Sequence, residues 1–283
     1  LHKAIRRQRQ MCIRDRVLAL IQIIGTLVYE FMFAHGLECT RSLYIDSLSL
    51  IMALIIGIVG TGICVYSIGY MHDFYFGIHH PETEMPDRRP TFFALMFVFL
   101  SAMYGIIFFN NMIWLFTAWE VTTLCSFLLI GFTKTDEAIH NAFRQIIMNL
   151  VGGIAFLAAL FYLAIQFSCI DFMDFIVFGT IAPTYVVLPL TCLSLAGITK
   201  AAQMPFHTWL LGAMVAPTPT SALLHSSTMV KAGVFMLIKC APIYAVSFAP
   251  SILVILVGGI TFLLCSMMAI SQSCLLYTSD AAD

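Results

Sequence analysis

Long apolar windows follow one another along the chain, and each is close to the length of a membrane-crossing helix. They lie at about 17–34, 47–71, 91–109, 112–132, 145–166, 185–204, 220–239 and 250–271. A helix needs about 20 apolar residues to cross the hydrocarbon core, where it satisfies its own backbone hydrogen bonds. The pattern predicts an all-α fold, a polytopic bundle of about eight transmembrane helices.

The composition supports a membrane protein and argues against several other classes. Of the 283 residues, 60% are hydrophobic and only 10% are charged, whereas soluble domains carry about 25% charged residues. The net charge of −1 offers no basic surface, so the expected surroundings are a lipid bilayer and no nucleic acid. The cysteines are scattered singly without a C-x-x-C pair, which predicts no iron–sulfur, zinc or haem site in this chain.

The two ends differ from the rest in composition. Residues 1–16 are strongly basic and give way abruptly to apolar sequence, and residues 274–283 follow the last apolar window. Both resemble translated adapter sequence, so we predict non-native tails at 1–16 and 274–283 around a truncated transmembrane domain at 17–273. A basic targeting arm is the alternative for the first tail, although it shows no recognisable processing site.

Basic residues in the short loops predict the orientation of the bundle. The loops at 72–90 and 133–144 lie two helices apart, on one side, and they hold Arg88, Arg89, Lys134 and Arg144. The connections on the other side, at 35–46, 110–111 and 167–184, hold only Arg41. The positive-inside rule therefore places the first pair of loops in the cytoplasm, or in the matrix of a mitochondrion. Lys239, at the outer end of its helix, fits this rule poorly.

Asn110 and Asn111 leave almost no room between two windows, so the helices on either side of them should form an antiparallel hairpin. Two acidic residues near window ends have ordinary structural explanations. Asp46 precedes an apolar run and is expected to cap a helix, and Glu30 is expected at the membrane interface.

Three charged residues fall inside the apolar windows. Glu120 and Lys231 lie near the middle of theirs, and Lys200 lies about three-quarters along 185–204. Each would cost roughly 2.5–3.5 kcal/mol if it stood alone in lipid. We therefore expect these residues to face protein or water and to pair, and a lysine so desolvated can exchange its proton near neutral pH. The alternative is a purely structural ion pair between Glu120 and a lysine.

Prolines interrupt the helical pattern beside Lys200. Pro205 cannot donate a hydrogen bond and should free the carbonyl of Ala201, while Pro217 and Pro219 make a second break. Broken helices of this kind mark ion sites in transporters. His207 follows the first break, and it is either a proton carrier or an interfacial structural histidine.

The segment LLHSSTMVKAGVF, residues 223–235, gathers polar residues in an apolar window. On an ideal helix, Ser221, His225, Ser227, Thr228 and Lys231 fill one arc of about 160°. A hydrated stripe of this kind can hold a water chain, and histidine titrates in the right range for a relay. Interhelical hydrogen bonding is the alternative, but it does not explain Lys231.

Several motifs resemble a known family. They are YIDSLSL (44–50), YSIGYM (66–71), WEVTTLCSFLLIGF (119–132) and TKAAQMPFHTWLLGAMVAPTPTSALLHSSTMVKAGV (199–234). They are similar to the antiporter-like subunits of respiratory complex I, chain 5 above all, and to their relatives in Mrp antiporters and energy-converting [NiFe] hydrogenases. The resemblance implies a fold of two inverted five-helix repeats, of which this chain covers the first.

The resemblance also implies roles for single residues. Glu120 matches the family's key glutamate, Lys200 its central lysine on a broken helix, and His225 its connecting histidine. Chain 5 commonly has threonine where this sequence has Lys231, which is more similar to the Mrp and hydrogenase branch. The segment MNLVGGIAF also lacks an arginine and an aspartate that are typical of chain 5, so the branch stays open.

The function expected on this basis is proton translocation in a redox-driven pump, either complex I or an energy-converting hydrogenase. Protons would pass from Lys200 through waters at Thr228 and His225 to Lys231. The chain would carry no cofactor, and partner subunits, including a peripheral redox arm, would hold iron–sulfur clusters with flavin or a NiFe centre. The expected location is a bacterial plasma membrane, with the mitochondrial inner membrane as the alternative. The rival function is a Na⁺/H⁺ antiporter subunit of the Mrp type.

Overall fold

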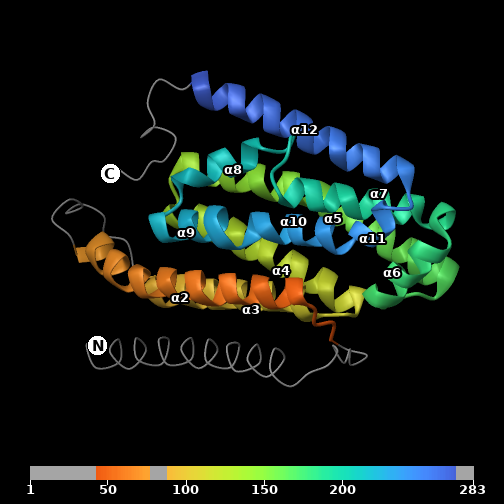
Figure 1. Ribbon diagram of the computed structural model, residues 1–283. Helices are drawn as coiled ribbons and strands as arrows, with labels where there is room; N and C mark the ends of the chain where they lie inside the picture. The colour runs from red at the N-terminus through yellow and green to blue at the C-terminus, as the bar shows by residue number, and fades with distance from the viewer. Residues whose placement is uncertain (1–42, 77–87, 272–283) are drawn as a thin grey trace.

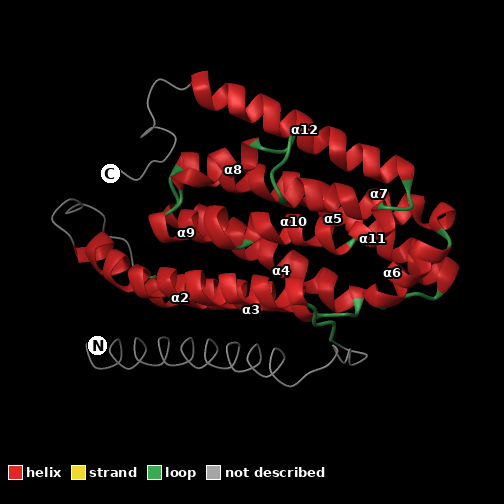
Figure 2. Cartoon of the chain, in the orientation of Figure 1, coloured by secondary structure: helices red, strands yellow, loops and turns green. Residues whose placement is uncertain are grey.

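The computed structural model describes residues 43–76 and 88–271, and within these ranges the protein is a bundle of helices without strands (Figures 1 and 2). The predicted all-α class is therefore confirmed. The long helices are α2 (Ser47–Phe76), α3 (Arg89–Phe108), α4 (Met112–Ile130), α5 (Asp136–Phe167), α7 (Pro183–Lys200), α10 (Met229–Lys239) and α12 (Phe248–Ser271). The predicted window 17–34 and both predicted tails lie outside the described residues.

Six helical segments of the described residues are long and apolar enough to cross a membrane. All six overlap predicted windows, including the segment from Thr218 to Lys239, which contains the window 220–239. Helix α7 is not among the six, because polar residues such as Lys200 at its end lower its hydropathy. Large apolar side chains, among them Ile58, Ile147 and Phe262, are exposed on the outside of the bundle, as expected of surfaces that face lipid.

The predicted α3–α4 hairpin is confirmed. Helix α3 ends at Phe108 and α4 begins at Met112. The Asn111 side chain caps α4 by accepting from the backbone amides of Ile113, at 2.9 Å, and Trp114. Capping satisfies amides that have no partner within the helix, which allows so tight a turn between two packed helices.

The three connections expected on one side of the membrane meet at one end of the bundle. The amide of Tyr44 donates to the carbonyl of Phe108 at 2.9 Å, and that of Phe172 donates to the carbonyl of Asn110 at 2.7 Å. A short helix that the apolar windows did not predict, α6 (Phe172–Ile181), lies at this end (Figure 1). The shared end is confirmed, while its assignment to the outer side stays a prediction.

Helix α5 is longer than predicted. The apolar window was 145–166, but the helix begins at Asp136, after Thr135 caps the amide of Ala138. The first turns are polar and partly exposed, so hydropathy alone does not find them. The extension gives α5 a polar beginning at the end of the bundle that holds the 131–135 connection.

The segment after α7 is divided into short pieces. Helix α8 (Thr208–Gly212), the 3₁₀ turn η2 (Ala213–Val215) and α9 (Thr218–Ala222) lead into η3 (Leu223–Ser227), a single turn of π-helix. Helix α10 follows, then the short α11 (Ala241–Tyr244). Both predicted breaks are therefore present, but the first does not arise as expected. Helix α7 already ends at Lys200, so Pro205 lies in the connection and not inside a helix.

Candidate functional site

Lys200 is fully buried at the last residue of α7, against one face of α4. Its Nζ donates to the carbonyl oxygen of Trp119 at 2.7 Å and to the hydroxyls of Thr122 at 2.6 Å and Thr123 at 3.2 Å. Thr122 and Thr123 each follow Trp119 by about one helical turn on α4, which brings the three oxygens close together. The lysine is thus held by neutral acceptors in the centre of the bundle.

The pocket matches a protonated lysine. Both threonine hydroxyls donate to the carbonyl of Trp119, so their oxygens are left to accept from Nζ. An ammonium group has three donors and no acceptor, and the pocket supplies three acceptors. The Trp119 ring lies 4.3 Å from Nζ, within cation–π range, and the carboxyl end of α7 favours positive charge.

Glu120 lies next to this pocket but forms no direct ion pair with Lys200 among the described contacts. Its Oε1 is buried and has no hydrogen-bond partner in the described part of the chain. The carboxyl group fits against Gly153 of α5, where a Cβ atom would lie 2.4 Å from Oε1. Glu120 and Lys200 are therefore neighbours without a direct bond, and the lysine is bonded instead to the main-chain carbonyl of Trp119.

The connection after Lys200 is held by specific contacts. The indole Nε1 of Trp209 donates to the carbonyl of Thr199 at 3.0 Å, and the amide of Met204 donates to the Thr261 hydroxyl at 3.0 Å. Carbonyls at a helix end need such partners when they are buried. His207 lies in this connection, half-buried, and its Nδ1 has no partner among the described residues.

The π-helical turn changes the predicted arrangement of the polar arc. The arc assumed 100° per residue, but η3 contains a wider turn and Thr228 has non-helical dihedral angles of −128° and −81°. The Thr228 hydroxyl donates to the carbonyl of Leu223, so it caps the π turn from within. The angles predicted for Ser221, His225 and Lys231 are therefore wrong, and the Ser227 side chain lies outside the described residues.

His225, within the π turn, and Lys231, just after it, both keep polar atoms available. His225 is half-buried within η3, and its Nε2 is buried without a described partner. Lys231 is half-buried near the start of α10 and makes no hydrogen bond or ion pair with the described residues. Helix α10 approaches α7 very closely, since a Cβ at Gly233 would lie 2.4 Å from the carbonyl oxygen of Gly197. Both lysines thus belong to helices in tight contact.

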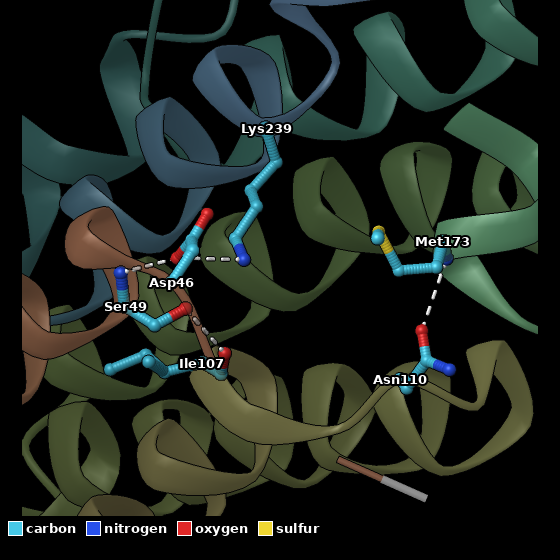
Figure 3. A network of polar contacts seen from close by, with 6 residues as sticks. All are labelled: Asp46, Ser49, Ile107, Asn110, Met173 and Lys239. Carbon is cyan, nitrogen blue, oxygen red and sulfur yellow. Dashed lines mark hydrogen bonds and ion pairs between the residues drawn. The ribbon is translucent and has the colours of Figure 1, made fainter. Parts of the chain in front are cut away.

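A second buried lysine, Lys239, lies at the C-terminal end of α10. Lys239 Nζ lies 3.0 Å from Asp46 Oδ1 (Figure 3), and 3.7 Å from the centre of the Tyr44 ring. Asp46 also accepts from the amide of Ser49 at 2.7 Å, which confirms its predicted capping role. Burial raises the pKa of Asp46, but the hydrogen bonds from Ser49 and the charge of Lys239 outweigh it and hold that pKa below its usual value. The misfit of Lys239 to the loop-charge rule is explained by this partner.

Comparison with known proteins identifies the family. The family model for the transmembrane part of NADH:quinone oxidoreductase and Mrp antiporter subunits matches residues 109–275, which include every candidate site residue. A second model, for the N-terminus of chain 5 of complex I, matches residues 31–75. The chain belongs to the NADH:quinone oxidoreductase/Mrp antiporter transmembrane family.

Named relatives of this family member are longer proteins. The Na⁺/H⁺ antiporter subunit A1 of Staphylococcus aureus is 35% identical over 233 residues, which are 81% of this chain and 28% of the relative. The structure of the Mrp complex from a Dietzia species matches with a TM-score of 0.67 at 27% identity, over 83% of this chain and 26% of the other. An archaeal membrane-bound sulfane sulfur reductase shares the fold, with a TM-score of 0.64 at 19% identity, over 80% of this chain and 46% of the other.

These findings establish the coarse properties of the chain. It is an integral bacterial membrane protein with the antiporter-like fold, as predicted. It spans about a quarter of the length of the curated relatives that it matches. The similar solved structures are subunits of multi-subunit membrane complexes.

Sequence reasoning missed the partners that hold the lysine. Trp119, Thr122 and Thr123 are spaced i, i+3 and i+4 on α4, which is a recognisable signal for one helical face. Gln145 and Asn149 on α5 are completely or almost completely buried and were also missed, although an i, i+4 pair of amides in an apolar helix is unusual. The Asp46–Lys239 pair has no local signal, because 193 positions separate the two residues.

Proposed function

We propose that this chain is part of a proton-translocating membrane subunit, in which Lys200 is the group that takes up and releases the proton. The observation that carries the proposal is the complete burial of Lys200 at the end of a broken helix, bound by three acceptors beside Glu120. An isolated charge at this depth is costly. A site that merely anchored two helices would not need one.

The geometry suggests how the proton is held and released. The protonated lysine uses all three acceptors of its pocket. On deprotonation the amine has a lone pair, and the Thr122 or Thr123 hydroxyl can satisfy it by turning its hydrogen from the Trp119 carbonyl towards Nζ. A change in the distance of Glu120 alters the electric field at the lysine. Glu120 therefore acts through charge and not through a shared hydrogen bond.

Onward transfer would follow the close contact between α7 and α10. His225 lies within the π turn and Lys231 follows it, and both present polar atoms without described partners. Water bridging these groups would take the proton onwards, towards the second repeat that the family resemblance implies. Thr228 shapes the turn through its bond to Leu223, while His207 has no described contact with the lysine pocket and is the weaker candidate.

The driving reaction of the first candidate is electron transfer in partner subunits. The chain would then be part of a complex I or an energy-converting hydrogenase, and the whole complex would be the enzyme. Iron–sulfur clusters, with flavin or a NiFe centre, would belong to the peripheral redox arm. The family model at residues 109–275 covers both candidates, and the model for the N-terminus of chain 5 of complex I at residues 31–75 supports this one.

The second candidate is a Na⁺/H⁺ antiporter subunit of the Mrp type. It is favoured by the names of the 35% identical relatives in Staphylococcus aureus and by the match to the Dietzia Mrp complex. In that case the proton step at Lys200 would be the same, but sodium movement would replace electron transfer as the coupled reaction.

One experiment separates the two candidates. The complex is purified through the full-length form of this subunit, and its nickel, iron and flavin contents are measured together with proton flux in proteoliposomes. Nickel with iron indicates a hydrogenase, and flavin with iron indicates complex I. An active complex that lacks all three and loses proton flux when sodium is removed is an antiporter. Flux that is unchanged by Glu120→Gln would contradict a proton role for this site.

A further inference from the structure

One buried face of α5 carries polar side chains that the lysine site does not use. Asn141, Gln145 and Asn149 follow each other at four-residue intervals and are 7%, 0% and 2% exposed. The row continues to Glu137, which is exposed at the beginning of the helix, and to Gly153, which touches Glu120. Residues four apart are neighbours on the helix surface, and each step of four turns the row by about 40°, so the row winds slowly along α5 with each member beside the next. It therefore leads from the surface to the carboxyl group beside Lys200.

The hydrogen bonds of this row fix the direction of both inner amides. The Ser126 hydroxyl donates to the carbonyl of Thr123 at 2.7 Å and accepts from Gln145 Nε2 at 2.7 Å. The Asn149 Nδ2 donates to the carbonyl of Gln145 at 3.0 Å. Because each nitrogen must face an acceptor, the oxygens Gln145 Oε1 and Asn149 Oδ1 point elsewhere, and both are buried without a described partner.

The unpartnered oxygens Gln145 Oε1, Asn149 Oδ1 and Glu120 Oε1 lie on the two helices that pack together here, α4 and α5. Helices α4 and α5 meet at Ser126 with Gln145 and again at Glu120 with Gly153, and Asn149 lies between these contacts on α5. All three unpartnered atoms are acceptors, so whatever satisfies them must donate. A buried acceptor without a donor costs about 1–3 kcal/mol, and water is the usual solution at polar buried sites.

We propose that the row of Asn141, Gln145 and Asn149 binds a file of water molecules that carries protons between the beginning of α5 and the Lys200 site. The inference rests on the proposed function, to which it adds the route of entry. Each water would donate to an amide oxygen and accept from the next water. The route begins at the end of the bundle that the loop charges place in the cytoplasm.

The test uses the full-length complex in proteoliposomes. Asn149→Leu and Gln145→Leu fill the row with apolar atoms of similar size, and each should lower proton flux at least about tenfold. Asn149→Leu should cost little thermal stability, because leucine has a similar shape and the water that it displaces no longer needs a buried partner. Asn149→Ser keeps a polar group and leaves space for water, so it should retain flux. The control is Ser194→Ala, which removes a buried, bonded hydroxyl on α7 and should cost stability but not flux.

The outcomes also separate this inference from the proposed function. If Lys200→Ala abolishes flux while both leucine variants keep it, the water file is wrong and the function stands. If Lys200→Ala has no effect, the proposed function itself fails. If high sodium restored the flux of the leucine variants, the row would be a sodium site, and the assignment to water would be wrong. Loss of flux by Asn149→Ser as severe as by Asn149→Leu would also contradict it.

Discussion

Two adjacent glycines on α5 offer a sharp test of how the site is assembled. Gly153 faces the Glu120 carboxyl group, and Gly152 faces the side chain of Thr199, next to Lys200. A Cβ at 153 would lie 2.4 Å from Glu120 Oε1, 3.2 Å from its Cδ and 3.5 Å from Oε2. The nearest separation is about 1 Å short of ordinary van der Waals contact, near 3.5 Å.

Gly153→Ala should therefore change function more than stability. The clash involves the end of a flexible side chain, which can turn away at a cost of about 0.5–1.5 kcal/mol. Alanine stabilises a helix by roughly 0.5–1 kcal/mol relative to glycine, which offsets that cost. We expect a melting temperature within about 2 °C of the parent but a clear fall in proton flux, because the carboxylate is displaced from its place beside the lysine.

Gly152→Ala should behave in the opposite way. Its Cβ would lie 1.9 Å from Thr199 Oγ1, 3.1 Å from Thr199 Cβ and 3.4 Å from the main-chain Cα of Ala196. The α5–α7 contact must open to admit it, which costs about 1–3 kcal/mol or more. Gly62→Ala is the control, since nothing lies within 4 Å of that position. Each variant is assayed by thermal unfolding in detergent and by proton uptake in proteoliposomes. Unchanged flux for Gly153→Ala, in a folded complex, would refute the claim that the position of Glu120 matters.

Three further substitutions test separate contacts. Asp46→Asn should lower stability by about 1–3 kcal/mol. This is less than the 3–5 kcal/mol of a fully buried pair, because the Asp46 side chain is 24% exposed. Combining Asp46→Asn with Lys239→Met should recover part of the loss, as measured by thermal unfolding. The pKa of Asp46 is lowered in the folded protein, so the stability that the Asp46–Lys239 pair contributes is fully present above the unfolded-state pKa of about 3.9. That stability is lost as pH falls through the lower folded-state pKa. Only the parent, and not Asp46→Asn, should show this acid-dependent loss. Trp209→Phe removes the indole donor to the Thr199 carbonyl, which keeps the amide of Ala202 as its donor, and should cost about 0.5–1.5 kcal/mol of stability; equal melting temperatures would contradict this. Thr122→Val removes the closest hydroxyl of the lysine pocket and should slow proton flux, and unchanged flux would mean that this hydroxyl is dispensable.

The sequence predicts the bundle well because burial in lipid leaves a strong local signal. Apolar windows found each long helix of the described residues, and the asparagine turn before α4 followed from the spacing alone. Helix ends were harder, since Asp136 and its neighbours begin α5 in a polar stretch that hydropathy assigns to a loop. The end of α7 at Lys200 depends on the contacts of the following segment and not on Pro205.

The site was predicted in its residues and only partly in its geometry. Lys200 and Glu120 stood out because charges are expensive at that depth. Their indirect relation depends on how α4 and α7 both pack against α5, which no local pattern records. The polar arc around His225 failed as a geometric prediction because an extra residue in the π turn shifts every later angle. Such a turn is set by tertiary contacts, including the bond from Thr228.

The measurement that tests the account most directly is proton flux by the full-length complex carrying Lys200→Ala, reconstituted in vesicles with its driving reaction intact. The Trp119 pocket should survive the substitution, because alanine removes the charge and leaves the acceptors of α4 in place. We expect coupled proton flux to be abolished while the complex remains assembled. Proton flux equal to that of the parent, in an assembled complex, would contradict the claim that protons pass through Lys200.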